Sequence, residues 1–303
     1  MDPEPDVVVV GSANLDLIVR VPHHPTTGET VLGGDHARTP GGKGANQAVA
    51  ASRLGARVAM VGRVGRDEAG EELRRSLEDA DVDCRYLAVE PGSPSGTALI
   101  GVDDAGENTI IVSPGANSRV CPEDITAAAA IFTQSRVTLT QLEIPTETVL
   151  AAAAASEGTV LLNPAPVAPL PPALLDRVDV LIPNRIELAQ LADSATPEEI
   201  SAVEAIARAL PVPTVVVTLG AQGALLVRDA DALHIPAPSV KVVDTTGAGD
   251  AFCGALATGL ARGISIEEAM LQAVHAGAIS TTRSGAQPSL PTATEVTALM
   301  GET

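Results

Sequence analysis

Short apolar runs alternate with longer amphipathic stretches along most of the chain. Val7–Val10 is a continuous β-branched run, which is typical of a strand buried on both faces of a parallel sheet. Strands that alternate with helices predict βαβ units, and therefore an α/β fold with an open, three-layer α/β/α, mainly parallel sheet. Further strands are expected at 57–61, 137–139, 159–162, 178–182 and 214–219, and helices at 45–54, 67–77, 122–132, 146–156, 197–210 and 251–260.

Two segments break this alternation. Residues 15–38 carry β-forming residues interrupted by prolines and show no helical pattern, and residues 97–112 are typical of two short strands joined by a turn at 103–106. We expect both segments to form a small β-sheet lid over the strand ends, where open α/β sheets bind ligands. The chain, residues 1–303, is then predicted to be a single domain with the lid inserted in its α/β core.

The lid also predicts how the protein assembles. Exposed strand edges pair readily with a second copy of the same strand, so we expect a homodimer formed through the lid. The lid should carry an apolar face, and its expected members are Val19, Val21, Leu99, Ile100, Ile110 and Ile111.

The net charge limits the partners. A formal charge of −19 and a pI of about 4.5 exclude nucleic acid and anionic membranes as favoured partners. An anionic ligand such as ATP would need a site built locally from amides, cations or a metal. Three cysteines without a C-x-x-C pair indicate a reducing compartment, so we expect a soluble, cytoplasmic protein.

The segment 244–250, with the sequence DTTGAGD, suits phosphate chemistry. Small residues just before an apolar helix let several main-chain N–H groups point at one place, where the helix dipole adds positive potential. Asp250 falls in the first turn of that helix and could accept a proton from an alcohol that attacks a phosphoryl group. By itself, the pattern also fits an ordinary helix N-terminus whose acidic residues offset the dipole.

The segment 39–48, TPGGKGANQA, places three glycines around a lysine before a helix. Glycine lets the backbone approach a ligand closely, and Lys43 and Asn46 can donate hydrogen bonds to hydroxyl groups held over the loop. The spacing is not that of a Walker A loop. The alternative interpretation is a plain glycine-rich turn.

Residues 11–16, GSANLD, follow the first strand at the position where doubly wound sheets place ligand loops. They lack the glycine pattern of dinucleotide-binding folds, which argues against a dehydrogenase. Asn14 and Asp16 lie two residues apart, so their side chains share one face of an extended segment. An amide and a carboxylate on one face suit vicinal sugar hydroxyls, although an Asx turn is the alternative.

Together these three segments resemble the ribokinases, within the PfkB family of carbohydrate kinases. The resemblance extends in order and spacing from about Val7 to Pro291, and it implies a ribokinase-like fold. Other matching stretches are PTTGE at 25–29, QLE at 141–143, NPAP at 163–166, PN at 183–184 with Glu187, TLGAQG at 218–223 and GAQPS at 285–289.

The resemblance implies a role for individual residues. Asp250 is the implied catalytic base, and Gly247, Ala248 and Gly249 form the implied anion hole for the transferring phosphoryl group. The residues implied to bind the sugar are Asn14, Asp16, Gly42, Lys43, Asn46, Glu143 and Asp250. Those implied to contact ATP are Asn184, Glu187, Thr218, Gly220, Gly223, Gly249 and His275.

Two of these residues also have simpler interpretations. Glu187 is implied to handle Mg²⁺ and phosphate, but a carboxylate in the first turn of a helix is common. His275 lies in an alanine-rich helical stretch, where a packed or solvated histidine is the usual outcome.

The resemblance further implies a site for a monovalent cation, normally K⁺, beside the anion hole. A cation held by main-chain carbonyls and one carboxylate would order the 244–249 loop and set the directions of its amides. The matching positions are Asp244, Thr246, Ser280, Arg283, Gly285 and Ser289.

The predicted reaction is transfer of the γ-phosphoryl group of Mg·ATP to the 5-hydroxyl of D-ribose, which gives ribose 5-phosphate and ADP. The chain has only three aromatic residues, Tyr86, Phe132 and Phe252, which argues against a nucleoside substrate that needs stacking. Fructose, 2-deoxyribose and a sugar phosphate are the alternative substrates. A sugar-binding regulator without turnover is an alternative of a different class.

Overall fold

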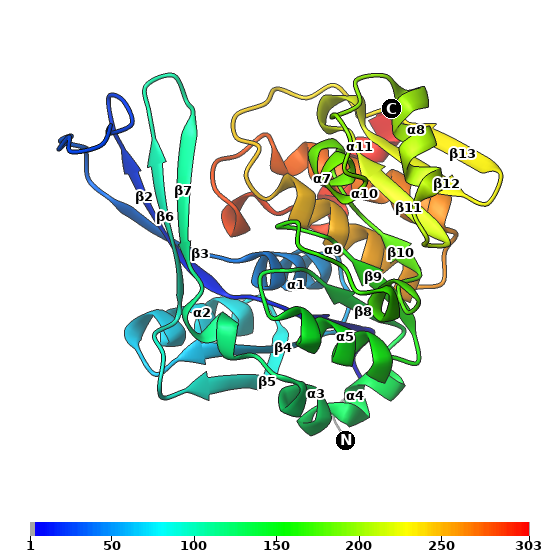
Figure 1. Ribbon diagram of the computed structural model, residues 1–303, viewed down its shortest axis with the longest axis horizontal. Helices are drawn as coiled ribbons and strands as arrows, with labels where there is room; N and C mark the ends of the chain where they lie inside the picture. Colours follow the sequence, from blue (N-terminus) through cyan, green and yellow to red (C-terminus); the bar gives the residue numbers. More distant parts are fainter. Residues whose placement is uncertain (1–3, 303) are drawn as a thin grey trace.

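A computed structural model describes residues 4–302, and within them the strands form a large sheet and a small one that stands off its side (Figure 1). The large sheet is parallel except at its β11–β12 and β12–β13 pairs, which confirms the predicted mainly parallel architecture. In spatial order its strands are β13 (Asp231–Ile235), β12 (Ala224–Arg228), β11 (Thr214–Thr218), β10 (Val180–Leu181), β9 (Thr159–Leu162), β8 (Val137–Thr140), β1 (Val7–Val10), β4 (Val58–Gly65) and β5 (Val82–Glu90).

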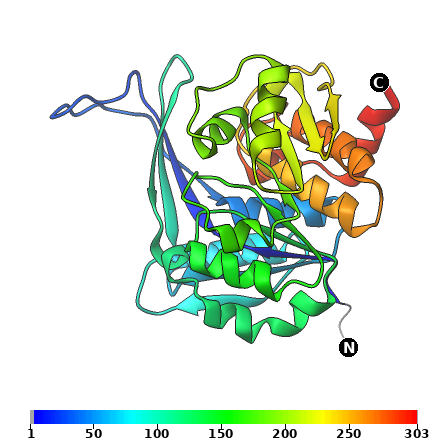
Figure 2. The same ribbon diagram turned by 45° about the vertical axis from the view of Figure 1, so that its right-hand side comes forward.

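Alternate residues of β1 enter two different cores, which explains its continuous apolar run. Val7 and Val9 pack on one face of the sheet, and Val8 and Val10 pack on the other. Helices therefore cover both faces (Figure 2), and no described helix is long and apolar enough to cross a bilayer. The first face carries α1 (Lys43–Arg53), α2 (Glu68–Glu78), α9 (Ala248–Ala261), α10 (Ile266–Ser280) and α11 (Ala293–Glu302). The second carries α3 (Pro122–Ala127), α4 (Ala129–Gln134), α5 (Thr146–Ala155), α6 (Pro172–Leu175), α7 (Arg185–Leu191) and α8 (Ile200–Ala209).

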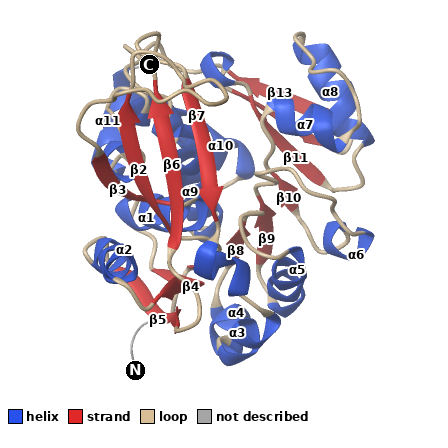
Figure 3. Ribbon diagram, turned by 60° about the vertical axis from the view of Figure 1, so that its left-hand side comes forward, coloured by secondary structure: helices blue, strands red, loops and turns tan. Residues whose placement is uncertain are grey.

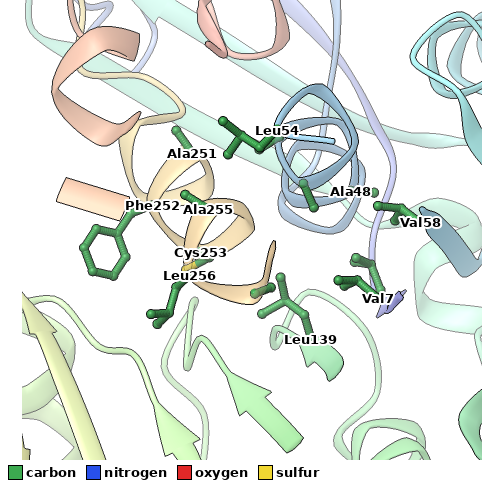
Figure 4. Packing of buried hydrophobic residues seen from close by; sticks show 14 of the residues in the cluster. Val7, Ala48, Leu54, Val58, Leu139, Ala251, Phe252, Cys253, Ala255 and Leu256 are labelled. Carbon is green, nitrogen blue, oxygen red and sulfur yellow. The ribbon is translucent and has the colours of Figure 1, made fainter. Parts of the chain in front are cut away.

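Helices α1 and α9 lie in close contact because small residues separate them. A Cβ added at Gly254 would lie 2.6 Å from the Cβ of Ala50 and 2.9 Å from the carbonyl oxygen of Gln47. One turn further along, the Thr258 hydroxyl donates to the Ala51 carbonyl at 3.2 Å. Figure 4 shows the core that both helices share with β1 and β8. Since the glycine-rich segments of the sequence precede both helices, this packing sets the distance between those segments.

The small sheet consists of the two segments expected to form a lid (Figure 3). Its first strand begins four residues after β1 ends, so the chain passes directly from the core into the small sheet. A turn at 103–106 joins two of its strands, as predicted, with Gly106 at a φ of +84°. In spatial order the strands are β3 (Ala37–Gly41), β2 (Asn14–Arg20), β6 (Gly96–Val102) and β7 (Asn108–Ser113).

The apolar residues expected on one face of the lid lie on both faces. Leu99 is paired with Ile111, and the next residue, Ile100, is paired with Ile110. Successive side chains of a strand point to opposite sides of its sheet, so these two pairs face in opposite directions. The expectation of a single apolar face was wrong for this reason.

Some element limits also differ from the predicted pattern. The helix expected at 122–132 is divided at Ala128, whose φ of −99° and ψ of 9° depart from helical values, into α3 and α4. Of the strand expected at 178–182, only β10 forms, and α8 begins at Ile200 instead of at 197. Strands β5, β12 and β13 were not predicted. Of these, β13 is nearly all exposed and carries no apolar pattern.

Candidate active site

The three predicted ligand segments meet at the carboxyl end of β1. Asn14 and Asp16 open β2, Lys43 and Asn46 lie in the first turn of α1, and Asp250 lies in the first turn of α9. A cavity of about 240 Å³ joins this region to residues predicted to contact the nucleotide. Its lining consists of Lys43, Asn163, Ala165, Ile182, Asn184, Glu187, Thr218, Thr245, Gly247, Gly249, Asp250 and Cys253.

The Asp250 carboxylate is buried and held by two side-chain amides from α1. The Nδ2 of Asn46 donates to Oδ2 at 2.9 Å, and the Nε2 of Gln47 donates to Oδ1 at 3.0 Å. Burial raises the pKa of Asp250, while the Lys43 ammonium and the two amides act to lower that pKa. The Oδ1 of Asn46 is buried without a hydrogen-bond partner among the described residues, so it is available to a ligand hydroxyl.

Four carboxylates and one ammonium share this site. Burial, with the nearby charges of Glu143 and Asp250, raises the pKa of Asp16 to about 7. Burial disfavours the charge of Lys43, but the attraction of Asp250, Glu143 and Glu187 raises the pKa of this ammonium overall. Ionised carboxylates accept hydrogen bonds and an ammonium donates them, so this group can bind a molecule that carries several hydroxyls.

Two of the predicted sugar residues are held by neighbours that the sequence did not identify. The Ser12 hydroxyl donates to Oε2 of Glu143 at 2.5 Å, and the main-chain N–H of Lys43 donates to the same oxygen at 3.0 Å. The Nδ2 of Asn117 donates to Oδ1 of Asn14 at 2.7 Å. Ser12 stands inside the GSANLD segment, whereas Asn117 lies far away in the sequence and gave no signal.

Gly42 has a backbone role that favours glycine. Its φ is +88°, in the left-handed region, and a Cβ there would lie 2.7 Å from the main-chain nitrogen of Asn14. The glycine-rich loop and the start of β2 therefore touch through their backbones.

The predicted anion hole forms the first turn of α9. Gly247 is the N-cap residue with a φ of +80°, and Gly249 is exposed to open space beside the cavity. The N–H of Ala248 donates to the Thr245 carbonyl at 3.2 Å, so in this conformation that amide closes the turn. The helix dipole still directs positive potential at the cavity.

On the nucleotide side, Asn184 caps α7. It forms a capping box with Glu187, in which each side chain accepts a hydrogen bond from the other residue's main-chain N–H at 2.8 Å. Glu187 thus fills the first turn of a helix, as its simpler interpretation expected, and also lines the cavity. Burial raises its pKa, opposed by the Asn184 N–H and by Lys43.

The remaining predicted nucleotide residues lie at different distances from this cavity. Thr218 lines it and bridges to Asn184 at the end of β11. Gly220 and Gly223 form the turn that follows, with φ values of +59° and +91°. His275 is buried in α10, where its Nδ1 contacts the Leu271 carbonyl at 2.8 Å, and it is not among the lining residues.

The residues of the predicted cation site come together from two segments. The Asp244 carboxylate accepts hydrogen bonds from the N–H groups of Thr246 and Gly285 at 2.9 and 2.8 Å. Burial acts to raise the pKa of Asp244, but these hydrogen bonds lower it overall, so the group is ionised at neutral pH. The hydroxyls of Ser280 and Ser289 donate to nearby main-chain carbonyls.

This arrangement fits a cation held by main-chain oxygens and one carboxylate. Arg283 is paired with Glu295, which leaves its carbonyl as the group it can offer. Among residues 4–302 there is no group of three or more His, Cys, Asp or Glu side chains suited to a metal ion. A weakly charged monovalent ion suits such a site better than a transition metal.

Comparison with known proteins identifies the family. Residues 4–293 match the pfkB family of carbohydrate kinases. The chain belongs to the PfkB family. Among its PfkB relatives, the ribokinase of Bacillus subtilis is 39% identical over 298 residues, which cover 97% of this chain and 99% of that protein. The deoxyribokinase of Salmonella typhi is 36% identical over 293 residues, covering 94% and 95%.

A solved structure gives the same result. The structure of Arabidopsis thaliana ribokinase complexed with ribose and ATP matches with a TM-score of 0.91 at 34% identity and covers 98% of this chain and 99% of that one. As a PfkB protein, the chain is a carbohydrate kinase that phosphorylates a sugar hydroxyl.

Proposed function

We propose that this kinase transfers the γ-phosphoryl group of ATP to the 5-hydroxyl of D-ribose, forming ribose 5-phosphate and ADP. The observation that carries the proposal is the buried Asp250 carboxylate, held by Asn46 and Gln47 at the end of a cavity that Lys43 and Glu187 also line. The likeness to a ribokinase complexed with ribose and ATP supports ribose as the sugar.

Asp250 acts as the catalytic base. It accepts the proton of the 5-hydroxyl while that oxygen attacks the γ-phosphorus in line, and the bond to the bridging oxygen of ADP breaks. The raised pKa of Asp250 makes it a better proton acceptor than an exposed carboxylate. Charge that develops on the phosphoryl group is stabilised by the N-terminus of α9 at Gly247, Ala248 and Gly249.

The sugar is held by groups on β2, α1 and the loop after β8. Asp16 and Glu143 accept hydrogen bonds from its hydroxyls, and Lys43 donates to them. The unpartnered Oδ1 of Asn46 accepts one more. Asn14 and the backbone at Gly42 complete the pocket, so the sugar is fixed before transfer.

The nucleotide and ion sites follow the family resemblance. Asn184, Thr218, Gly220, Gly223, Gly249 and His275 are the proposed contacts to ATP, with Glu187 beside its phosphates. Asp244, Thr246, Ser280, Arg283, Gly285 and Ser289 would hold K⁺. When bound, Mg²⁺ neutralises phosphate charge and K⁺ orders the 244–249 loop.

A panel of sugars tests the substrate. ADP release is measured with D-ribose, 2-deoxyribose, fructose and adenosine, with and without K⁺. We expect the highest kcat/KM with ribose. The likeness to a deoxyribokinase makes 2-deoxyribose the second candidate, and a preference for it or for fructose would contradict the proposal.

A variant of Asp250 tests the mechanism. Asp250→Asn keeps the shape of the side chain but removes the base, so kcat should fall by about 10³-fold while ATP affinity stays within about 2-fold. Near-normal turnover would remove Asp250 from its role.

The same chain is proposed to be a cytoplasmic homodimer formed through the lid. Leu99 and Ile111 on one face of the small sheet, and Ile110 and Val112 on the other, are between 47% and 63% exposed, so each face carries exposed apolar side chains. Three free cysteines support a reducing compartment. Light scattering at micromolar concentration should give the mass of a dimer, and a monomer would contradict the assembly.

A further inference from the structure

Gln47 lies directly behind the proposed catalytic base and has no implied role in sugar or nucleotide binding. It is 0% exposed, and its side chain contacts α9 and the loops that follow β8 and β9. Its Nε2 donates to Oδ1 of Asp250 at 3.0 Å and to Oδ1 of Asn163 at 3.2 Å. Its Oε1 accepts from the Nε2 of Gln141 at 2.5 Å. Both ends of this amide are therefore used.

The neighbours of Gln47 fix which end of its amide faces Asp250. Gln141 donates to the oxygen of Gln47, while its own Oε1 is buried without a hydrogen-bond partner among the described residues, so Asn163 and Asp250 decide the orientation. Asn163 donates its own Nδ2 to the Ile182 carbonyl at 2.9 Å, so it presents an oxygen to Gln47. If the Gln47 amide turned over, its oxygen would face two acceptors, Oδ1 of Asn163 and the Asp250 carboxylate, without a proton between them.

We propose that Gln47, held by Gln141 and Asn163, is a positioning residue for Asp250. It fixes the rotation of the Asp250 carboxylate and keeps this group in the ionised form that accepts the sugar proton. The proposal rests on the function proposed above. Asn46 binds the other oxygen of the carboxylate and also faces the sugar, whereas Gln47 has no polar atom left for a ligand. Gln47 therefore acts through Asp250 and not on the substrate.

The charges around Asp250 give the expected direction of the effect. Burial and Glu143 raise the pKa of Asp250, and Lys43, Asn46 and Gln47 act to lower it. The other titratable groups that interact with it are Asp16 on β2, Glu187 on α7 and Cys253 on α9, and burial keeps the Cys253 thiol protonated. Loss of the Gln47 donor removes stabilisation of the ionised form, so Asp250 would be protonated at higher pH.

Gln47→Met tests the proposal because methionine has nearly the shape of glutamine but cannot donate. The readouts are kcat and KM between about pH 5.5 and pH 9.5. We expect the acidic limb of the kcat profile to move up by about one pH unit. At pH values below the wild-type acidic limb, the kcat of the variant should be about 10-fold lower than that of the wild type, and at alkaline pH it should approach the wild-type value. The KM values for sugar and for ATP should stay within about 2-fold of the wild-type values.

Thr258→Val is the matched control. It also removes a buried polar group that connects α1 with α9, but two turns away from Asp250. It should lower the melting temperature and leave the pH profile in place. If Gln47→Met does not fold, Gln141→Met decides, because it leaves Gln47 in place but removes the hydrogen bond to its Oε1, so that the amide is held toward Asp250 less firmly. The acidic limb should then move in the same direction by a smaller amount.

The two proposals fail in different ways. A Gln47→Met profile that superimposes on the wild-type profile, or an equal loss of kcat at every pH, would overturn the positioning role. A raised sugar KM with an unshifted limb would overturn it as well, because Gln47 would then shape the sugar pocket. Near-normal turnover by Asp250→Asn would instead overturn the proposed function, and the positioning role with it.

Discussion

The buried charge of Asp16 lowers the stability of the folded protein, and the substitution Asp16→Asn should remove this loss. Its side chain is buried, and no hydrogen bond to its carboxylate is present among residues 4–302. Burial, Glu143 and Asp250 raise its pKa from 3.8 to about 7. Asp16→Asn removes the titrating charge and keeps the shape, so the ligand-free variant should be more stable than the wild type at neutral and alkaline pH.

The size and sign follow from linkage between protonation and folding. A difference of about three pKa units, at about 1.4 kcal/mol each, makes at most about 4 kcal/mol. Folding raises the pKa of Asp16, so the wild-type protein has its full stability below pH 3.8, where the carboxyl group is protonated in both states. It loses this stability as the pH rises through about 7, where the buried carboxylate becomes charged. Burying the new amide without partners offsets about 1 kcal/mol. The free energy of unfolding should therefore rise by about 2–3 kcal/mol near pH 8 and fall by up to about 1 kcal/mol near pH 4.

Thermal unfolding of the ligand-free protein between about pH 4 and pH 9 measures this difference. For a chain of 303 residues, each kcal/mol moves the melting temperature by about 1.5 °C, so we expect a gain of about 3–5 °C near pH 8. Calorimetric titration with ribose should show at least about 10-fold weaker binding, since a charged acceptor is lost.

Asp67→Asn is the control for this experiment. Asp67 is the N-cap of α2, and although burial acts to raise its pKa, hydrogen bonds from Ser95 and Gly70 lower it overall. The same chemical change at Asp67 should therefore lower the melting temperature at neutral pH. Equal or lower stability of Asp16→Asn at pH 8, or a gain that does not grow with pH, would refute the reasoning.

Three further substitutions test how the site is held. Asn117→Leu should raise the sugar KM about 10-fold through loss of the bond to Asn14, with the ATP KM unchanged; steady-state kinetics measure both, and an unchanged sugar KM would argue against the role. Gly41→Ala should lower the free energy of ribose binding, measured by calorimetry, more than it lowers the free energy of unfolding, because its Cβ would lie 2.3 Å from Oδ2 of Asp16. Asp244→Ala should abolish stimulation by K⁺ in the ADP-release assay, and persistent stimulation would place the cation elsewhere.

The sequence was sufficient to predict those parts of the fold in which local pattern and final environment agree. The four valines of β1 are buried on both faces, and Asp67 caps α2 with its side chain accepting from Gly70. Such features depend on a few neighbouring residues. The resemblance to PfkB kinases then indicated how these elements are arranged in the fold.

Contacts between residues far apart in the sequence could not be predicted in this way. Asn117 reaches the loop at Ala13 across 104 residues, and Gln141 reaches Gln47 across 94. Neither polar side chain stands in a pattern that reveals its partner. The two faces of the lid were misjudged because adjacent apolar residues, such as Leu99 and Ile100, do not reveal which side of a sheet meets solvent.

The close packing of α1 against α9 limits which positions of this protein can be substituted. Gly254 leaves room only for a hydrogen atom, so any larger residue there would wedge apart the helix that carries Asn46 and the helix that carries Asp250. The catalytic base Asp250 and the sugar-binding loop before α1 would then lose their relative positions, whichever sugar is bound. Variants with a new sugar preference are therefore expected to retain this glycine and to differ in the lid strands and in the loop that carries Glu143.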